Sequence, residues 1–239
     1  MLEIKGVRDK LMRAVECDQT GLILEAQDLY DDGRQMLYQI MAHETDEAKK
    51  KSLNERIREY IDRAEQIKEH VQKLGVGGKL VAHIPIDENS VGNSYRSLFG
   101  KYLDAEVKEV LLEEPHLYRR HHFQNLISFL ELLVKNCPCF RYIRLVTKTS
   151  SESPDDQRNA LEQIKTDLSR RNVTLRIKIV DTQHDRKVVL SSGYIIMIGL
   201  GLDIFKPLNP FYSLGLCDND FRNCKQTEVN IFRKKNLAS

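Results

Sequence analysis

The chain lacks the marks of an exported or membrane-spanning protein. It has no apolar run close to the ~20 residues needed to cross a bilayer. Its first residues, Met1 to Lys5, contain neither the basic segment nor the continuous apolar segment of a signal peptide. The five cysteines are odd in number, and their spacings match neither a secreted disulfide framework nor a CxxC zinc knuckle. We therefore expect an intracellular protein without structural zinc.

Net charge is also small, and it is unevenly divided. The formal net charge is +2, although 30% of the 239 residues are charged. Residues 1–80 carry 14 Lys and Arg against 16 Asp and Glu, whereas residues 81–239 carry 23 against 19. This basic excess is too sparse to predict nucleic-acid binding, but it permits contact with an anionic membrane. The length allows one large domain or two smaller ones, here an acidic module joined to a mildly basic one.

The clearest local pattern is a helix over residues 53–74. Its apolar residues recur every three or four positions and form one seam, Leu53, Ile57, Tyr60, Ala64, Ile67, Val71 and Leu74. Ile61 falls about 80° from this seam, among Arg58, Glu65 and Lys68. Ile61 either widens the core stripe or anchors a groove for a partner helix, with Glu65 placed to meet a cation.

Two further helical patterns precede this one. The first has one face of Ile4, Val7, Leu11, Ala14, Val15 and Asp18, and the glycine of Gln19-Thr20-Gly21 ends it. The second has the stripe Leu22, Ala26, Leu29, Gly33, Met36 and Ile40. Gly33 costs about 1 kcal/mol relative to alanine, so we expect a neighbouring helix to approach closely there. The three helices predict an antiparallel bundle.

These residues resemble the microtubule-interacting and trafficking (MIT) domain across all three helices, from about residue 3 to 75. The resemblance rests on Leu11-Met12-Arg13-Ala14-Val15-Glu16-x-Asp18, Ala26-x3-Tyr30-x2-Gly33-x3-Leu37 and Tyr60-Ile61-Asp62-Arg63-Ala64-Glu65-x-Ile67-Lys68. It implies that a groove between the second and third helices receives the tail helix of an ESCRT-III subunit, the MIT-interacting motif. The implied contacts are Ile61 under the tail's leucines, Glu65 against its basic residue, and more weakly Asp62. Leu29 and Met36 are candidates for the facing wall, although the sequence leaves open which flank they cover.

The carboxy-terminal part has a different pattern. Three glycines in residues 75–78 predict a hinge, and we expect a linker over residues 76–93. From Ser94 on, helices alternate with apolar strands, which predicts an α/β sheet. The expected helices span 95–103, 116–135, 156–170 and a short piece at 202–205, and the expected strands 106–112, 142–148, 173–180, 187–190, 194–198 and 228–232. Strand 194–198 is apolar on both faces, so we expect it to be central and covered on both sides.

One candidate for chemistry lies in this part, His184-Asp185-Arg186. A phospholipase D nucleophile follows the pattern HxKx4D, but here Arg186 takes the lysine position and Ser191 the acid position. No second HxK occurs, so one chain cannot form a two-motif active site. The pattern favours a degenerate, inactive site. The alternative is a phosphodiesterase or nuclease that uses His184 across a dimer.

Residues 95–235 are similar to the phospholipase D-like domain that follows the MIT domain in one family of MIT proteins. The similarity rests on Ser94-Tyr95-x-Ser97-Leu98-Phe99-x2-Tyr102-Leu103, the His184 motif, the run Gly193 to Phe205, and Phe211-x-Ser213-Leu214-Gly215-x-Cys217-Asp218-x-Asp220, with Tyr194 in place of an expected tryptophan. It implies a homodimer without phosphodiesterase activity or cofactor that binds acidic phospholipids. It also implies a cytoplasmic adaptor, peripheral on late endosomes and at the midbody, that acts in abscission at the end of cytokinesis. The expected domains are therefore an all-α three-helix bundle at 1–75 and a phospholipase D-like α/β domain at 94–239.

Candidate lipid contacts are cationic residues of this domain. Arg119 and Arg120 open a helix, where positive charge opposes the helix dipole, although a solvated face is the simpler explanation. Further candidates are Arg186, Lys206 and the terminal run Arg233-Lys234-Lys235, each residue worth about 1 kcal/mol near an anionic bilayer if it faces one. His121 and His122 form a poor metal pair because adjacent helix residues point about 100° apart.

Overall fold

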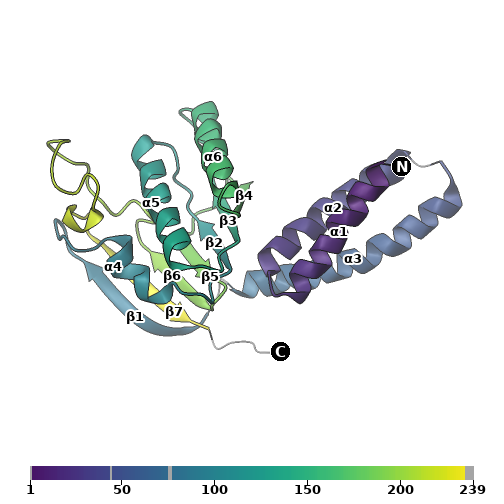
Figure 1. The fold of residues 1–239 in the computed structure, drawn as a ribbon, viewed down its shortest axis with the longest axis horizontal. Coiled ribbons are helices and arrows are strands. Elements are labelled where there is room, and N and C mark those ends of the chain that lie inside the picture. The colour runs from purple at the N-terminus through teal and green to yellow at the C-terminus, as the bar shows by residue number, and fades with distance from the viewer. Residues whose placement is uncertain (1, 44, 75–76, 235–239) are drawn as a thin grey trace. The chain divides into compact units, whose positions relative to one another are not determined.

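The computed structural model describes residues 2–43, 45–74 and 77–234 (Figure 1). The chain divides into two compact units, Met1–Val76 and Gly77–Ser239. Among the described residues, the helices lack the combination of length and apolar character that a membrane span requires. Each unit has its own core and is described by itself.

The first unit consists of the three predicted helices, α1 (Leu2–Gln19), α2 (Ile23–His43) and α3 (Glu47–Leu74). Gly21 has φ +78° and turns the chain between α1 and α2. The core contains the predicted apolar residues Val7, Leu11, Ala14, Ala26, Tyr30, Leu37, Ala64, Ile67 and Val71. The side chains of Ile4, Leu53, Ile57 and Leu74 lie outside the described residues.

Gly33 is the position where α1 approaches α2, as its cost in a helix predicts. A Cβ added to Gly33 would lie 2.5 Å from Cδ2 of Leu11. Since real Cβ atoms do not make contacts this short, a larger residue at position 33 would push the two helices apart. The expectation of close packing at Gly33 is confirmed.

The second unit is a seven-stranded mixed sheet in the order β1-β7-β6-β5-β2-β3-β4. Strands β2, β3 and β4 are parallel to each other, and the remaining pairs are antiparallel. The strands are β1 (Lys79–Ile86), β2 (Glu109–Glu113), β3 (Tyr142–Thr147), β4 (Thr174–Ile179), β5 (Lys187–Leu190), β6 (Tyr194–Ile198) and β7 (Thr227–Arg233).

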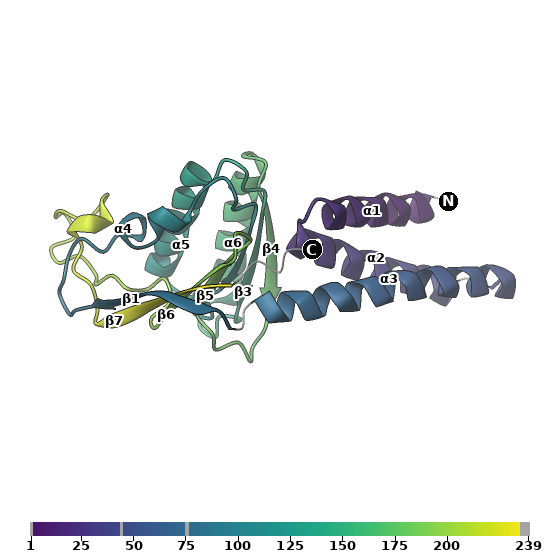
Figure 2. The ribbon, with the colours of Figure 1, turned by 90° about the horizontal axis from the view of Figure 1, so that it is seen from below.

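The helices α4 (Tyr95–Phe99), α5 (Arg120–Asn136) and α6 (Pro154–Ser169) lie on the same side of this sheet (Figure 2). A short 3₁₀ turn at Gly100–Tyr102 follows α4, and a second at Asn219–Phe221 precedes β7. Between helices and sheet, a fully buried aromatic cluster joins Tyr95 and Phe99 of α4 to Phe129 of α5 and to Phe205. Helices on an apolar sheet confirm the predicted α/β class.

Three sequence predictions need correction. The expected linker at 76–93 contains β1, which pairs with β7 from Lys79↔Arg233 to Ile86↔Thr227. Pro85 is tolerated there because β1 is an edge strand. Residues 202–205 form a turn and a single bridge, Phe205↔Cys224, rather than a helix. Strand β6 lies between β5 and β7, as expected for a central strand. Met197 of this strand is exposed, so β6 is not covered on both faces of the sheet as predicted.

Candidate functional site

Ile61 lies at the edge of the bundle core. Its side chain is half-buried, whereas Ala64 and Ile67 of the same helix are buried. On one side, Arg63 holds Asp18 of α1 through two hydrogen bonds of 2.6 and 2.7 Å. Because Ile61 lies about 160° from Arg63 around α3, it must be on the flank away from α1. Ile61 is therefore not sealed inside the core, and it borders the α2–α3 side of the bundle.

Two acidic side chains accompany Ile61 on the surface of α3. Glu65 is exposed and lies one turn further along the same flank, about 40° around from Ile61. Asp62 is also exposed but points further towards solvent, about 100° from Ile61. An apolar anchor with a carboxylate one turn away fits a partner helix that carries a leucine and a basic residue.

Leu29 and Met36 are the candidates for the facing wall whose flank the sequence left open, and in the structure their stripe lies on the α1 side of α2. A Cβ on Gly6 of α1 would lie 3.9 Å from Cε of Met36, so Met36 packs towards α1. Glu25 of α2 is bonded to Arg13 of α1 at 2.7 Å, and Leu29 lies one turn after Glu25 on the same stripe. The helical periodicity of the apolar residues correctly placed Leu29 and Met36 on one stripe of α2. It does not indicate which neighbouring helix that stripe faces.

The opposite flank of α2 carries residues that the sequence reasoning missed. Tyr38 and Met41 lie about 140–160° around α2 from Met36, on the side away from α1. Tyr38 is exposed and Met41 half-buried. On the inner side of this flank, Tyr30 of α2 packs against Tyr60 of α3 with ring centroids 6.2 Å apart. Tyr38 and Met41 replace Leu29 and Met36 as candidates for the second wall of the groove.

A second candidate site lies where strands β2, β3 and β5 meet their loops. Lys148 follows β3, and its Nζ is 3.4 Å from Nδ1 of His184 in the loop before β5. Arg186 donates from Nη1 to the carbonyl of Gly199 at 2.8 Å, while its Nε is buried without a partner among the described residues. The pKa of His116 is lowered by burial and by the positive charges of Arg186 and Lys148. This strand-end cluster thus gathers Lys148, Arg186 and two histidines, and Asp181 lies at its edge, where it accepts the N–H of Thr149 at 3.3 Å.

A buried acid, Glu114, completes this cluster and was not predicted. Glu114 is only 3% exposed. Its carboxylate accepts the backbone N–H of Leu202 at 2.7 Å and that of His116 at 3.4 Å. Burial raises the pKa of Glu114 to about 7. The signal for it in the sequence is an acid directly after an apolar strand, and only the fold shows that Arg186 lies nearby.

Two positions of the phospholipase D pattern, Arg186 and Ser191, make hydrogen bonds elsewhere in the second unit. Arg186, at the position of the lysine, donates from Nη1 to the carbonyl of Gly199. Ser191, which takes the position of the acid, lies beyond the other end of β5 and accepts the N–H groups of Lys108 and Glu109 at 2.8 and 3.2 Å. Ser191 therefore serves the connection to β2, and no described contact links it to His184.

His121, His122 and Asp203 are the potential metal ligands that lie within 4.8 Å of one another in the described part of the chain. His122 caps α5, because its Nδ1 accepts the N–H groups of Tyr118 and Arg119, both at 3.2 Å. A neutral His122 ring must then keep its proton on Nε2, the atom that faces Asp203. Lys225 already neutralises Asp203 at 2.6 Å. The donor set does not suit a divalent cation.

His122 should make the stability of the second unit depend on pH. Burial, helped by the neighbouring His121, lowers the pKa of His122 to about 4 from the 6.5 expected in an unfolded chain. Its stabilising contribution is complete above pH 6.5 and is lost as the pH falls towards 4, because the unfolded chain then binds a proton that the fold excludes. Between pH 7 and 4.5 the loss is about 2–3 kcal/mol.

Urea unfolding of the wild type and of His122→Asn at pH 7 and 4.5 tests this prediction. Asparagine keeps an acceptor for the cap but does not titrate. The stability difference between the two proteins should shrink by about 2–3 kcal/mol at pH 4.5. Glu114 and other titrating groups are common to both proteins and cancel in the comparison. Parallel pH profiles would show that His122 does not carry the effect.

No contact between the described residues joins the four predicted lipid-binding residues into one patch. Lys206 is half-buried and bonded to Glu88 and to Asn89. Arg186 is tied to Gly199, as described above. Arg119 and Arg120 remain exposed at the start of α5, with Arg119 only loosely paired to Glu152 at 4.0 Å. Of the four, Arg119 and Arg120 are the exposed pair, whereas Arg186 and Lys206 are half-buried.

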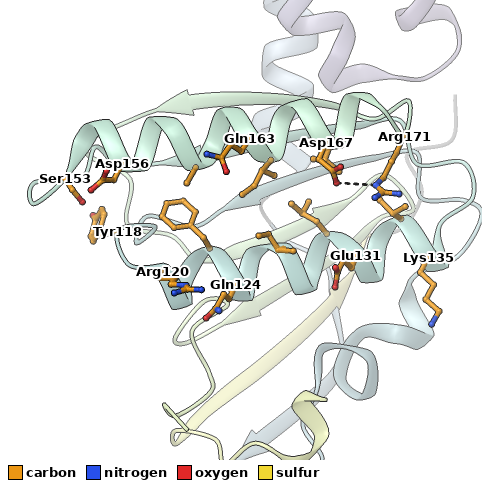
Figure 3. A pocket seen from close by; sticks show the side chains of 17 residues that line it. Tyr118, Arg120, Gln124, Glu131, Lys135, Ser153, Asp156, Gln163, Asp167 and Arg171 are labelled. Atoms are coloured by element: carbon orange, nitrogen blue, oxygen red, sulfur yellow. Dashed lines mark hydrogen bonds and ion pairs between the residues drawn. The ribbon is translucent and has the colours of Figure 1, made fainter. Parts of the chain in front are cut away.

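A groove of about 980 Å³ runs between α5 and α6 (Figure 3). Its apolar lining consists of Phe123, Ile127, Leu130, Val134, Ala160, Ile164 and Leu168. Charged residues of both signs also line it, Arg120, Glu131, Lys135, Asp156, Asp167 and Arg171, and the last two are bonded to each other at 3.3 Å. The groove can accept an apolar helix face, but its mixed charges select no particular partner.

The models of two known protein-domain families match the chain. Residues 9–69 match the MIT (microtubule interacting and transport) domain, and residues 92–233 match the phospholipase D-like domain at the C-terminus of MIT. The chain therefore belongs to the family of MIT proteins that carry a phospholipase D-like domain at the C-terminus. The MIT domain-containing protein 1 of Mus musculus is 38% identical to it over 227 residues, which cover 94% of this chain and 91% of the mouse protein. The family and fold class expected from the sequence are confirmed.

Proposed function

We propose that this chain is a non-enzymatic adaptor that docks the tail helices of ESCRT-III subunits on the α2–α3 flank of its MIT domain. The observation that carries the proposal is the half-buried Ile61 on the flank away from α1, with Glu65 exposed one turn later. Membership of the MIT family supports it, because MIT domains in general bind the MIT-interacting motifs of ESCRT-III-type proteins.

In this proposal, the second unit forms a homodimer and binds acidic membranes, which keeps the complex at the membrane. Two MIT domains that face a polymer of tails would raise weak single-site binding through effective concentration. The site of action is then the cytoplasm, at late endosomes and at the midbody, during abscission at the end of cytokinesis. The resemblance to the family, together with the basic excess of residues 81–239, supports this part.

Charge reversal at Glu65 tests the groove. Tail peptides from a panel of ESCRT-III subunits should bind Glu65→Arg about fivefold to tenfold more weakly than the wild-type full chain, because an ion pair becomes a repulsive pair. Reversing the facing basic residue of the tail should restore binding. Glu16→Arg, an exposed change on α1, is the matched control. Equal losses for both variants would indicate a general charge effect rather than a contact at Glu65.

The absence of catalysis is tested directly with a phosphodiester substrate. The contact of Lys148 with His184 makes the strand-end cluster the one place in the described chain where we would look for turnover. We expect no turnover above background in the wild type, and the same background rate in His184→Ala. Turnover that disappears in His184→Ala alone would establish a phosphodiesterase and overturn the adaptor proposal for this unit.

A further inference from the structure

One long loop of the second unit is apolar and uncharged. Residues 207–217, which we call the apolar loop, contain no Asp, Glu, Lys, Arg or His, in a chain that is 30% charged. Figure 1 shows this segment, in yellow-green, projecting away from the sheet and its helices. A projecting loop is normally polar, because its side chains face water. The composition of the apolar loop is therefore the opposite of what solvent exposure favours.

The side chains of the apolar loop are strongly exposed. Phe211, Tyr212 and Leu214 are 59%, 87% and 78% exposed, and Leu216 is exposed as well. The rings of Phe211 and Tyr212 pack edge to face, with centroids 5.2 Å apart. Single exposed apolar residues are ordinary on protein surfaces, but four within six positions form a patch that indicates an interaction site.

Two further apolar side chains, Phe221 and Val91, are exposed, and a Cβ on Gly215 of the loop would lie 3.2 Å from the backbone carbonyl carbon of Phe221. The N–H of Gly92 donates to the carbonyl of Asp220 at 2.8 Å, so the backbone segments that carry Val91 and Phe221 are neighbours. Asp220 is itself held by the N–H of Ser94 at 3.0 Å. The patch thus gathers residues from two separate segments.

The base of the apolar loop is fixed to the fold. The N–H of Lys206 donates to the carbonyl of Asn223, and Nη2 of Arg222 donates to the carbonyl of Lys206, both at 2.8 Å. Gly215 has φ +96° and packs so closely on Arg222 that an added Cβ would lie 2.7 Å from Cγ. Within the loop, Oγ of Ser213 donates to the carbonyl of Pro210 at 2.8 Å. These bonds fix the base of the apolar loop to the rest of the second unit.

We propose that the apolar loop inserts its Phe211, Tyr212 and Leu214 side chains into the boundary between headgroups and acyl chains of a lipid bilayer. The loop is a convex projection rather than a recess, it carries no charge that would resist entry, and its tip pairs an aromatic hydrocarbon with a phenol, the composition found at membrane interfaces. The inference rests on the proposed membrane association and adds the residues that enter the lipid.

The test uses the full chain and vesicles of phosphatidylcholine with about one third phosphatidylserine. The double variant Phe211→Glu/Leu214→Glu should bind these vesicles at least tenfold more weakly than the wild type, because two carboxylates would have to enter the interface. Both residues are exposed, so the fold should be retained, which circular dichroism checks. Ile127→Glu, an exposed apolar position in the groove between α5 and α6, is the matched control and should bind within twofold of the wild type.

A fluorescent reporter gives a second readout. The chain has no tryptophan, so Tyr212→Trp introduces a single one at the tip of the loop. Its emission should shift to the blue on adding vesicles and should be quenched by lipids that carry a quencher on the acyl chain. Vesicle binding of normal strength with an unshifted emission would overturn the loop proposal and leave membrane association intact. A wild type that binds no vesicles would overturn both, and a blue shift caused only by tail peptides would make the loop a protein contact instead.

Discussion

Replacing Ile61 by aspartate should weaken the binding of ESCRT-III tail peptides by about 100-fold. Ile61 is the apolar residue on the flank of α3 away from α1, and it is only half-buried without a partner. A tail helix would complete its burial, and central apolar anchors of this kind are worth about 2–4 kcal/mol. A carboxylate at position 61 would also place a charge under the tail's leucines. Titration calorimetry of the full chain with a tail peptide measures the effect.

The matched control is Met12→Asp, the same kind of substitution at an exposed apolar residue of α1. It should leave the affinity within about twofold of the wild type, because Met12 is not on the α2–α3 flank. The helical signal in circular dichroism should survive in both variants. A loss of binding in Met12→Asp with normal binding in Ile61→Asp would move the tail to a surface of α1 and refute the assignment.

Replacing Gly201 by alanine should destabilise the second unit by about 2–5 kcal/mol. Gly201 has φ +63°, a conformation that costs other residues about 1–2 kcal/mol. In addition, its Cβ would lie 2.1 Å from Oε2 of the buried Glu114, the oxygen that accepts the N–H of Leu202. Moving Glu114 aside would break that bond in the interior, which adds a desolvation cost of about 1–3 kcal/mol.

Gly92→Ala separates these two causes. Gly92 has φ +82°, but no atom lies within 4 Å of the position of its Cβ. Its replacement should therefore cost only the backbone strain of about 1–2 kcal/mol. Urea unfolding, followed by circular dichroism, compares both variants with the wild type. Similar losses for Gly92→Ala and Gly201→Ala would mean that Glu114 does not fix the turn after β6.

Local patterns in the sequence predicted most of the fold. The helices of the first unit and the hairpin of β5 and β6 follow from periods of 3.6 and 2 and from glycine turns, which depend only on nearby residues. Strand β1 was missed because its stability comes from pairing with β7, far along the chain. Its flanking glycines and Pro85 resemble a linker when that partner is not known.

The sites were less predictable because they depend on which surfaces meet. The stripe of α2 that contains Leu29 and Met36 was recognised, but only the structure, through the closeness of Met36 to Gly6 and of Gly33 to Leu11, shows that it faces α1. Glu114, Lys148 and Arg186 come from separate segments, and the sheet brings them together at its strand ends. The apolar loop was read only as part of a family motif, since a sequence does not show whether phenylalanine and leucine are buried.

The most direct test of the adaptor proposal is the methyl NMR spectrum of isoleucines in the full chain during titration with an ESCRT-III tail peptide. Ile61 and Ile67 lie on the same helix, the first half-buried on the α2–α3 flank and the second in the core. The proposal predicts that the Ile61 methyl signal shifts and saturates with the binding isotherm while that of Ile67 hardly moves. An unchanged Ile61 signal at saturating peptide would contradict the proposal.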